Sequence, residues 1–407
     1  MRPVTTLAIG AALLGSTAVP AFADAHATEM HFIMCGDEVR PADQAIIDQF
    51  VAENDGVTVN LEAVPWGNCQ DKSLTLAAAG DPPSIAYMGS RTLRQLASND
   101  LIVPVTFTQE QMDAFQPGVL RTVTYNGQQW GMPHAFSTKA LYMNCDLIEA
   151  AGAECVAPAT WEDMRALAQA VVDNTDAAGV GLAGKDFDNT MHQFLNYLYS
   201  NGGTVIAEDG SVALDSQQTR EALEFYASLV PLAQEGVLEW ERDAMRDLFN
   251  DGQIAMYING PWGWGQHNES INQMVAPVPH GPSGESGTLL ITDSIVVFNG
   301  SGHEDLAMEL ARALTTGQSQ YELDSSWGLT PILQYDKLGF SDLYYEADPA
   351  HWANFISSIP TGGPEPLITD FRSLQAVFVN MIQGAILGED SIDNLVSIAA
   401  EELADAL

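Results

Sequence analysis

Residues 30–64 read MHFIMCGDEVRPADQAIIDQFVAENDGVTVNLEAV, and this stretch decides the fold. Its apolar opening, 30–34, predicts a short buried strand, and 41–53 carries apolar side chains at helical spacing. Residues 57–64 then alternate between apolar and polar like a second strand. Strand, helix and strand in this order predict a parallel βαβ unit, because parallel neighbours need a crossover connection.

The same alternation continues along the chain and predicts an α/β layer architecture. Further strands are expected at 85–88, 141–143, 254–258 and 289–298. Further helices are expected at 71–79, 92–98, 161–173, 191–200, 218–234 and 371–386.

The amino terminus has the pattern of a secretory signal peptide. Arg2 precedes an apolar run from Val4 to Val19, and Ala21-Phe22-Ala23 supplies the small residues of a cleavage site. We expect a leader at 1–23 and a mature chain in the periplasm. No later stretch approaches the roughly 20 uncharged residues of a spanning helix, so no membrane insertion is expected.

The charge balance excludes two classes of partner. Fifteen Lys and Arg stand against 54 Asp and Glu, a formal net charge of −39. A field of that sign repels phosphate backbones and anionic headgroups, so neither nucleic acid nor a membrane surface is an expected partner.

Four cysteines in an exported chain predict disulfides. Of the three possible pairings, the one that closes the shortest loops joins Cys35 to Cys69 and Cys145 to Cys155. A metal site is the rival interpretation, but C-x-x-C spacing and adjacent histidines are missing. We expect neither metal nor cofactor.

Motifs of catalysis are also missing from the sequence. It contains no H-E-x-x-H, Walker A, G-x-S-x-G or EF-hand pattern. Among 54 acidic residues, a carboxylate pair at glycosidase separation arises by chance, so the acid count says little about hydrolysis. A protein without catalysis is therefore the expectation, and an exported carbohydrate-active enzyme is the alternative.

Tryptophans give the more informative signal. Six lie beside Gly, Pro or Asn, where rings are expected to project from loops: Trp66, Trp130, Trp262, Trp264, Trp327 and Trp352. Residues 260–265, GPWGWG, hold two of these rings between glycines. Flat rings near amide and carboxylate acceptors suit sugars, which present C–H faces and hydroxyl edges.

Residues 255–264, AMYINGPWGW, resemble a signature segment of the family 1 extracellular solute-binding proteins of ABC sugar importers, the maltose-binding-like proteins. AAAGDPPSIA at 77–86, GMP at 131–133, LYMNCDL at 141–147 and TWED at 160–163 are similar to other family segments in the same order.

The resemblance implies a type II, Venus-flytrap fold of two α/β lobes joined by crossing segments. We expect an N-terminal lobe of 24–135 plus 291–335 and a C-terminal lobe of 136–290 plus 336–407. It also implies a mono- or oligosaccharide ligand in the cleft between the lobes, an ABC permease as partner, and a monomer.

The same resemblance places the ligand-binding residues. Trp262 falls on the sugar-stacking tryptophan, Ser90 and Arg91 follow a first-lobe strand, and Ser137 comes just after the crossover. His192 lies at a second-lobe helix, and Asp370 and Arg372 lie in the late cleft segment. Three further contacts are expected from their Gly and Pro neighbours and not from the resemblance, with ordinary packing as the alternative: Trp66, Trp264 and Trp327. For Asp293, at an expected crossover, the alternatives are an acceptor of ligand hydroxyl hydrogen bonds and a cap of a strand end, and we favour the cap.

Arg91 and Arg372 depart from the maltose-binding protein, which has an acid and an aromatic residue at these places. In a chain poor in basic residues, they favour an anionic ligand such as a sulfonated, phosphorylated or carboxylated sugar. The competing interpretation is that each arginine pairs with a neighbour, for example Arg372 with Asp370. A sensor accessory with the same fold is a further alternative to an importer.

Overall fold

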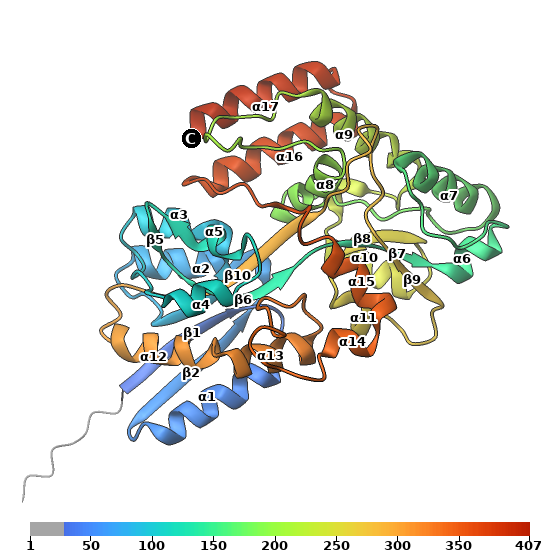
Figure 1. Cartoon of the computed structure of the whole chain (residues 1–407). Helices are drawn as coiled ribbons and strands as arrows, with labels where there is room; N and C mark the ends of the chain where they lie inside the picture. The colour runs from blue at the N-terminus through green and yellow to red at the C-terminus, as the bar shows by residue number, and fades with distance from the viewer. Residues whose placement is uncertain (1–27) are drawn as a thin grey trace, which may run out of the picture.

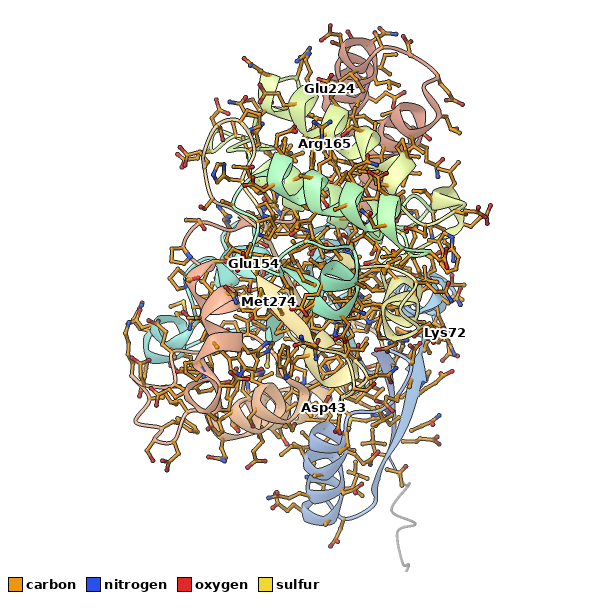
Figure 2. All side chains as sticks on the ribbon, turned by 90° about the vertical axis from the view of Figure 1, so that its right-hand side faces the viewer. Asp43, Lys72, Glu154, Arg165, Glu224 and Met274 are labelled. Carbon is orange, nitrogen blue, oxygen red and sulfur yellow. A yellow bond between two sulfur atoms is a disulfide. The ribbon has the colours of Figure 1, made fainter. Side chains whose placement is uncertain are left out.

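The computed structural model describes residues 28–407, and the expected signal peptide lies outside these residues. Within the described part of the chain, no helix has both the length and the apolar character that crossing a membrane demands. Figure 1 shows two lobes, and Figure 2 gives the view turned by 90°, with Asp43 and Lys72 in one lobe and Arg165 and Glu224 in the other.

The first lobe is built on a six-stranded sheet of order β11-β10-β3-β1-β2, with β6 also paired to β10. The predicted βαβ unit is confirmed: β1 (Thr28–Cys35) and β2 (Val57–Val64) are parallel and joined through α1 (Pro41–Glu53). β3 (Ile85–Gly89) pairs parallel with β1 on its other side.

Helices cover this sheet on both faces. α1 packs against α12 and α13, whereas α2 packs against β1 and β3 (Figure 1). The other elements near this sheet are α2 (Trp66–Ala78), η1 (Ser90–Thr92), α3 (Leu93–Ser98), α4 (Gln109–Ala114), α5 (Val119–Val123), β4 (Thr124–Tyr125), β5 (Gln128–Gln129), α12 (Glu304–Leu314) and α13 (Gly317–Trp327).

The second lobe has a three-stranded antiparallel sheet of order β8-β7-β9 surrounded by helices. Its strands are β7 (Ala140–Asn144), β8 (Met256–Asn259) and β9 (Gln273–Ala276). The remaining helices are α6 (Cys145–Ala150), α7 (Trp161–Asn174), α8 (Asp188–Tyr199), α9 (Gln217–Ser228), η2 (Val230–Leu232), η3 (Val237–Glu239), α10 (Arg242–Asn250), α11 (Gly263–Gln266), α14 (Tyr344–Ala347), α15 (Pro349–Ser357), α16 (Phe371–Leu387) and α17 (Ile392–Ala406).

Two paired strands cross between the lobes. β10 (Leu289–Val297) runs antiparallel to β6 (Met132–Ser137), and β11 (Gly363–Pro364) pairs with the start of β10. Leu289 and Ile291 join the core of the second lobe, whereas the end of β10 joins the core of the first (Figure 1). Two predicted lobe boundaries, 135/136 and 290/291, fall within these crossing strands, whereas the third, 335/336, lies between α13 and α14. The residue ranges of the lobes stay a prediction.

The expectation that the six tryptophans project from loops is wrong for several of them. Trp66 begins α2, Trp327 ends α13, and Trp352 is buried inside α15. The flanking residues were helix-end signals: Pro65 precedes α2, and Gly328 caps α13 with φ 67°.

Both disulfides form as the shortest-loop pairing predicts. Cys35 bonds to Cys69 with 34 residues of sequence separation, and Cys145 bonds to Cys155 with 10. The first bond fastens α2 to the end of β1, where Cys35 lines the interlobe cleft.

Removing the Cys35–Cys69 bond by a double serine substitution should lower the free energy of unfolding by about 2–4 kcal/mol. The Cys145–Cys155 double variant should lose about 1 kcal/mol less, because a smaller loop constrains the unfolded chain less. Urea unfolding of both variants measures this order. Equal losses, or a larger loss for the shorter loop, would show that loop entropy does not set the difference.

Candidate binding cleft

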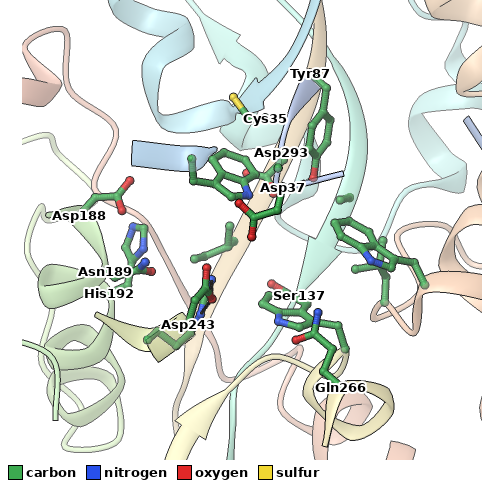
Figure 3. Close-up of a pocket in the computed structure, with 18 of the residues that line it drawn as sticks. Cys35, Asp37, Tyr87, Ser137, Asp188, Asn189, His192, Asp243, Gln266 and Asp293 are labelled. Atoms are coloured by element: carbon green, nitrogen blue, oxygen red, sulfur yellow. Dashed lines mark hydrogen bonds and ion pairs between the residues drawn. The ribbon is translucent and has the colours of Figure 1, made fainter. Parts of the chain in front are cut away.

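A cleft of about 300 Å³ lies between the lobes and takes side chains from both. Figure 3 shows Asp37 and Tyr87 on one side of it and Asp188, Asn189 and His192 on α8 at another.

The first lobe contributes groups at the ends of its strands. Gly36 and Asp37 follow β1, Tyr87 lies in β3, and Asp293 lies in β10 where β10 pairs with β3. Ligands of open α/β sheets bind beside the carboxyl ends of parallel strands, and the cleft has this position relative to β1 and β3.

Trp262 is held at the cleft by the turn that follows β8. A Cβ on Gly260 would come within 2.4 Å of the Trp262 indole, so only glycine leaves room for the ring. The Tyr142 hydroxyl fastens the turn, donating to the Gly260 carbonyl at 2.9 Å and accepting from the Trp264 amide at 3.1 Å. Trp262 is thereby held partly buried, with its side chain lining the cleft.

Two further tryptophans line the cleft from the first lobe, Trp66 and Trp327. Trp66 meets Tyr87 edge to face, with ring centroids 5.8 Å apart. The Arg40 guanidinium carbon lies 3.9 Å from the Tyr87 ring centre and 4.7 Å from that of Trp327. Aromatic rings on both sides of a polar cleft suit a ligand with apolar faces and polar edges.

Arg91 lies between carboxylates of several segments. Its Nη2 donates to Asp188 Oδ2 at 2.7 Å, and its Nη1 lies 3.5 Å from Glu365 and 3.8 Å from Asp293. His192 Nε2 lies 2.5 Å from Glu365 Oε1. Asp188 begins α8 of the second lobe, so Arg91 ties the two lobes together.

The charges of this cluster shift the pKa values of its members in opposite directions. Burial alone would raise the pKa of Asp188, but the charge of Arg91 and the hydrogen bond that it donates outweigh this effect and hold the pKa below its ordinary value. Burial raises the pKa of Asp293 against the pull of Arg91. Burial opposes the charge of Arg91, yet Glu365 and Asp188 together raise its pKa.

The structure brings six of the ten predicted ligand-binding residues to the cleft: Trp66, Arg91, Ser137, His192, Trp262 and Trp327. The other four do not line it. Ser90 bonds to Ser294 at 2.7 Å, Trp264 packs on the His351 ring, and Asp370 caps α16. Arg372 pairs with Asp71 on α2, so its partner is not the neighbouring Asp370.

Other cleft residues escaped the sequence interpretation. Lys139 lies two residues after the predicted contact Ser137, and Arg242 and Arg246 recur at helical spacing on α10. The signal that the sequence offered for Lys139 is a basic residue immediately before an apolar strand in a very acidic chain. Asp293 is no strand cap: it faces the cleft and accepts a hydrogen bond from the Tyr87 hydroxyl at 3.1 Å.

Two α/β lobes that enclose a tryptophan-lined, polar cleft beside crossing strands define a two-lobe ligand-binding protein. Residues 45–351 match the family described as bacterial extracellular solute-binding protein. Because this match covers more than half of the chain, the protein belongs to that family.

Two relatives match this chain over different shares of its length. A Brucella abortus chain named only as a candidate binding protein is 27% identical over 402 residues, which cover 97% of this chain and 96% of that one. A maltodextrin-binding protein of Bacillus subtilis is 24% identical over 301 residues, 69% of this chain and 66% of its own.

Solved structures share the fold. A solute-binding protein of Thermotoga lettingae, bound with α-D-tagatose, has a TM-score of 0.82 at 22% identity, covering 93% of this chain and 99% of that chain. The maltose-bound MalE3 of T. maritima also has a TM-score of 0.82 at 22% identity, covering 94% and 100%. The expected two-lobe α/β fold is confirmed.

Proposed function

We propose that this protein is the periplasmic binding subunit of an ABC importer and that it holds a mono- or oligosaccharide in the interlobe cleft. The observation that carries the proposal is the Trp262 indole, held by its glycine turn where it lines a cleft rich in hydrogen-bonding groups. The protein then delivers the sugar to the membrane permease, as an exported monomer without membrane insertion.

The relatives support a sugar as the ligand. The Bacillus subtilis relative is named for maltodextrin, and the two structural neighbours hold tagatose and maltose. Micromolar affinity requires about −8 kcal/mol, which ring stacking and charge-assisted hydrogen bonds can supply after ordering costs.

Closure of the lobes around the ligand supplies the signal that the permease reads. A ligand that touches both lobes only in the closed form shifts the population towards that form. Side chains from both lobes line the cleft, as this mechanism requires: Trp66 and Trp327 from one, Trp262 and His192 from the other.

The proposal includes no catalytic step. The Arg91 guanidinium engages Asp188 directly and lies within 3.8 Å of Asp293, so these two cleft carboxylates are already partnered by a cation. Incubating the protein with a sugar that binds it should return that sugar unchanged; any released product would favour the carbohydrate-active enzyme instead.

A thermal-shift screen of neutral mono- and oligosaccharides and of acidic sugars tests the proposed function. A ligand present at 100 times its Kd stabilises the folded state by about 2.7 kcal/mol through mass action. We expect at least one sugar to raise the melting temperature by several degrees, with saturation. No shift with any sugar of the screen would contradict sugar binding.

A further inference from the structure

We propose that the ligand of this cleft carries an acidic group, a carboxylate, sulfonate or phosphate, which binds Lys139 Nζ and the Arg242 guanidinium beside the Trp262 indole. This inference rests on the proposed function and narrows its ligand class. Neither of these two cations was among the residues expected to bind ligand from the sequence.

Lys139 is a buried amine that faces the cleft, and the described residues give it no carboxylate partner. Its residue is 3% exposed, and its Nζ donates to Ser137 Oγ at 2.7 Å. Within residues 28–407, no carboxylate oxygen lies within 4.0 Å of this Nζ. An ammonium has three N–H donors, so donors remain for a ligand after the bond to Ser137. Burial disfavours the charged form of an unpaired amine, and a bound anion would stabilise that form.

Arg242 lies near the same indole. Its guanidinium carbon is 5.3 Å from the Trp262 ring centre, and Lys139 Nζ is 4.5 Å from that centre. Within residues 28–407, the one carboxylate within 4.0 Å of the Arg242 guanidinium is that of the adjacent Asp243, at 3.0 Å. Two cations that share one ring repel each other in a partly dry site, and an anion bound by both removes this repulsion.

The wider charge distribution agrees. Five of the fifteen basic residues line this one cleft: Arg40, Arg91, Lys139, Arg242 and Arg246. Each of the four arginines lies within 4.0 Å of at least one carboxylate of the described chain, whereas Lys139 does not. Five acidic residues line the same cleft: Asp37, Glu38, Asp188, Asp243 and Asp293. The lining is therefore balanced in charge, whereas the whole chain carries −39, so an anionic ligand is repelled less in the cleft than at the rest of the surface.

Protonation of Lys139 links binding to pH. Burial, together with Arg242, lowers the pKa of Lys139 well below its usual range. The other charged groups that face it are Arg91, Asp293 and Glu365. A bound anion favours the charged form of the Lys139 amine and therefore raises its pKa, so binding is coupled to the uptake of a proton. The affinity for the anion falls as the pH rises above the pKa that Lys139 has in the unliganded protein.

Titration with inorganic sulfate, followed by tryptophan fluorescence at low ionic strength, tests the proposal. We expect saturable binding that is at least tenfold weaker in Lys139→Met, and Lys337→Met is the matched control because it removes an equal charge from an exposed site outside the cleft. Absence of saturable binding to the unaltered protein, or equal binding by Lys139→Met, would overturn the proposal. If Lys139→Met does not fold, Arg242→Gln is judged by the same criterion.

A second titration separates this inference from the proposed function. The affinity for glucose is compared with those for glucuronate, glucose 6-phosphate and 6-deoxy-6-sulfoglucose. The affinity for galactose is compared with that for galacturonate. If an acidic sugar binds more tightly than its neutral counterpart and Lys139→Met abolishes this preference, the result supports both sugar binding and the acidic ligand and identifies the acidic group. A neutral member that binds as tightly overturns the acidic ligand but leaves sugar binding intact. If no sugar binds, the proposed function fails, and the sulfate titration then decides by itself whether Lys139 and Arg242 form an anion site.

Discussion

Replacing Arg91 by leucine is expected to lower the free energy of unfolding by about 3–5 kcal/mol, because removing one partner of a buried ion cluster leaves the others uncompensated. Asp188 and Glu365 are 2% and 3% exposed, and both lie within 3.5 Å of the Arg91 guanidinium. Urea unfolding at neutral pH measures the loss.

Arg372→Leu is the matched control for this prediction. Arg372 also pairs with an aspartate across the lobes, but its side chain is 65% exposed. Exposed pairs contribute roughly 0–1 kcal/mol, so the control should unfold almost like the unaltered protein. Similar losses for the two variants would mean that the Arg91 cluster does not hold the lobes together as described.

Trp262→Ala is expected to weaken sugar binding roughly 10- to 100-fold, because buried aromatic anchors at binding sites contribute about 1.4–2.7 kcal/mol or more. The substitution removes the indole that lines the cleft. Isothermal calorimetry with a sugar from the thermal-shift screen measures the change.

Trp264→Ala provides the comparison, since this tryptophan lies two residues further on and packs on His351, outside the cleft. It should bind the sugar as the unaltered protein does. If Trp264→Ala loses affinity and Trp262→Ala keeps it, the assignment of the stacking ring is wrong.

Hydrophobic periodicity predicted the α/β class and several elements because this signal is local, whereas the two-lobe fold was expected from the family resemblance. The βαβ unit of 28–64 and helix α7 follow from side-chain patterns within a few turns, and their observed bounds agree closely with the predicted ones. By contrast, α10 was not predicted: Met245, Leu248 and Phe249 do form an apolar face at helical spacing, but the helix has nine residues and most of them are charged or polar.

The site was predictable only where the signal was local. The glycines around Trp262 mark a ring that needs room, and that residue does line the cleft. The pairing of Arg91 depends on Asp188 and Glu365, which lie 97 and 274 residues away in sequence. No sequence pattern near Arg91 reveals that carboxylates of the protein already compensate its charge. A structural arginine therefore could not be distinguished from a ligand-binding one.

The ligand-class inference follows from this difference. From the sequence, Arg91 and Arg372 favoured an anionic ligand. In the structure, both arginines have carboxylate partners within the protein. Among the five basic residues that line the cleft, Lys139 is the one that has no carboxylate within 4.0 Å in the described chain, and the sequence interpretation did not select it.

A crystal structure with the best sugar of the thermal-shift screen tests the central claim most directly. The account predicts one pyranose between the lobes, with its C–H face against the Trp262 indole and hydrogen bonds to groups of both lobes. A sugar bound elsewhere, for example in the apolar groove beside Phe107 and Leu338, with the interlobe cleft empty, would contradict it.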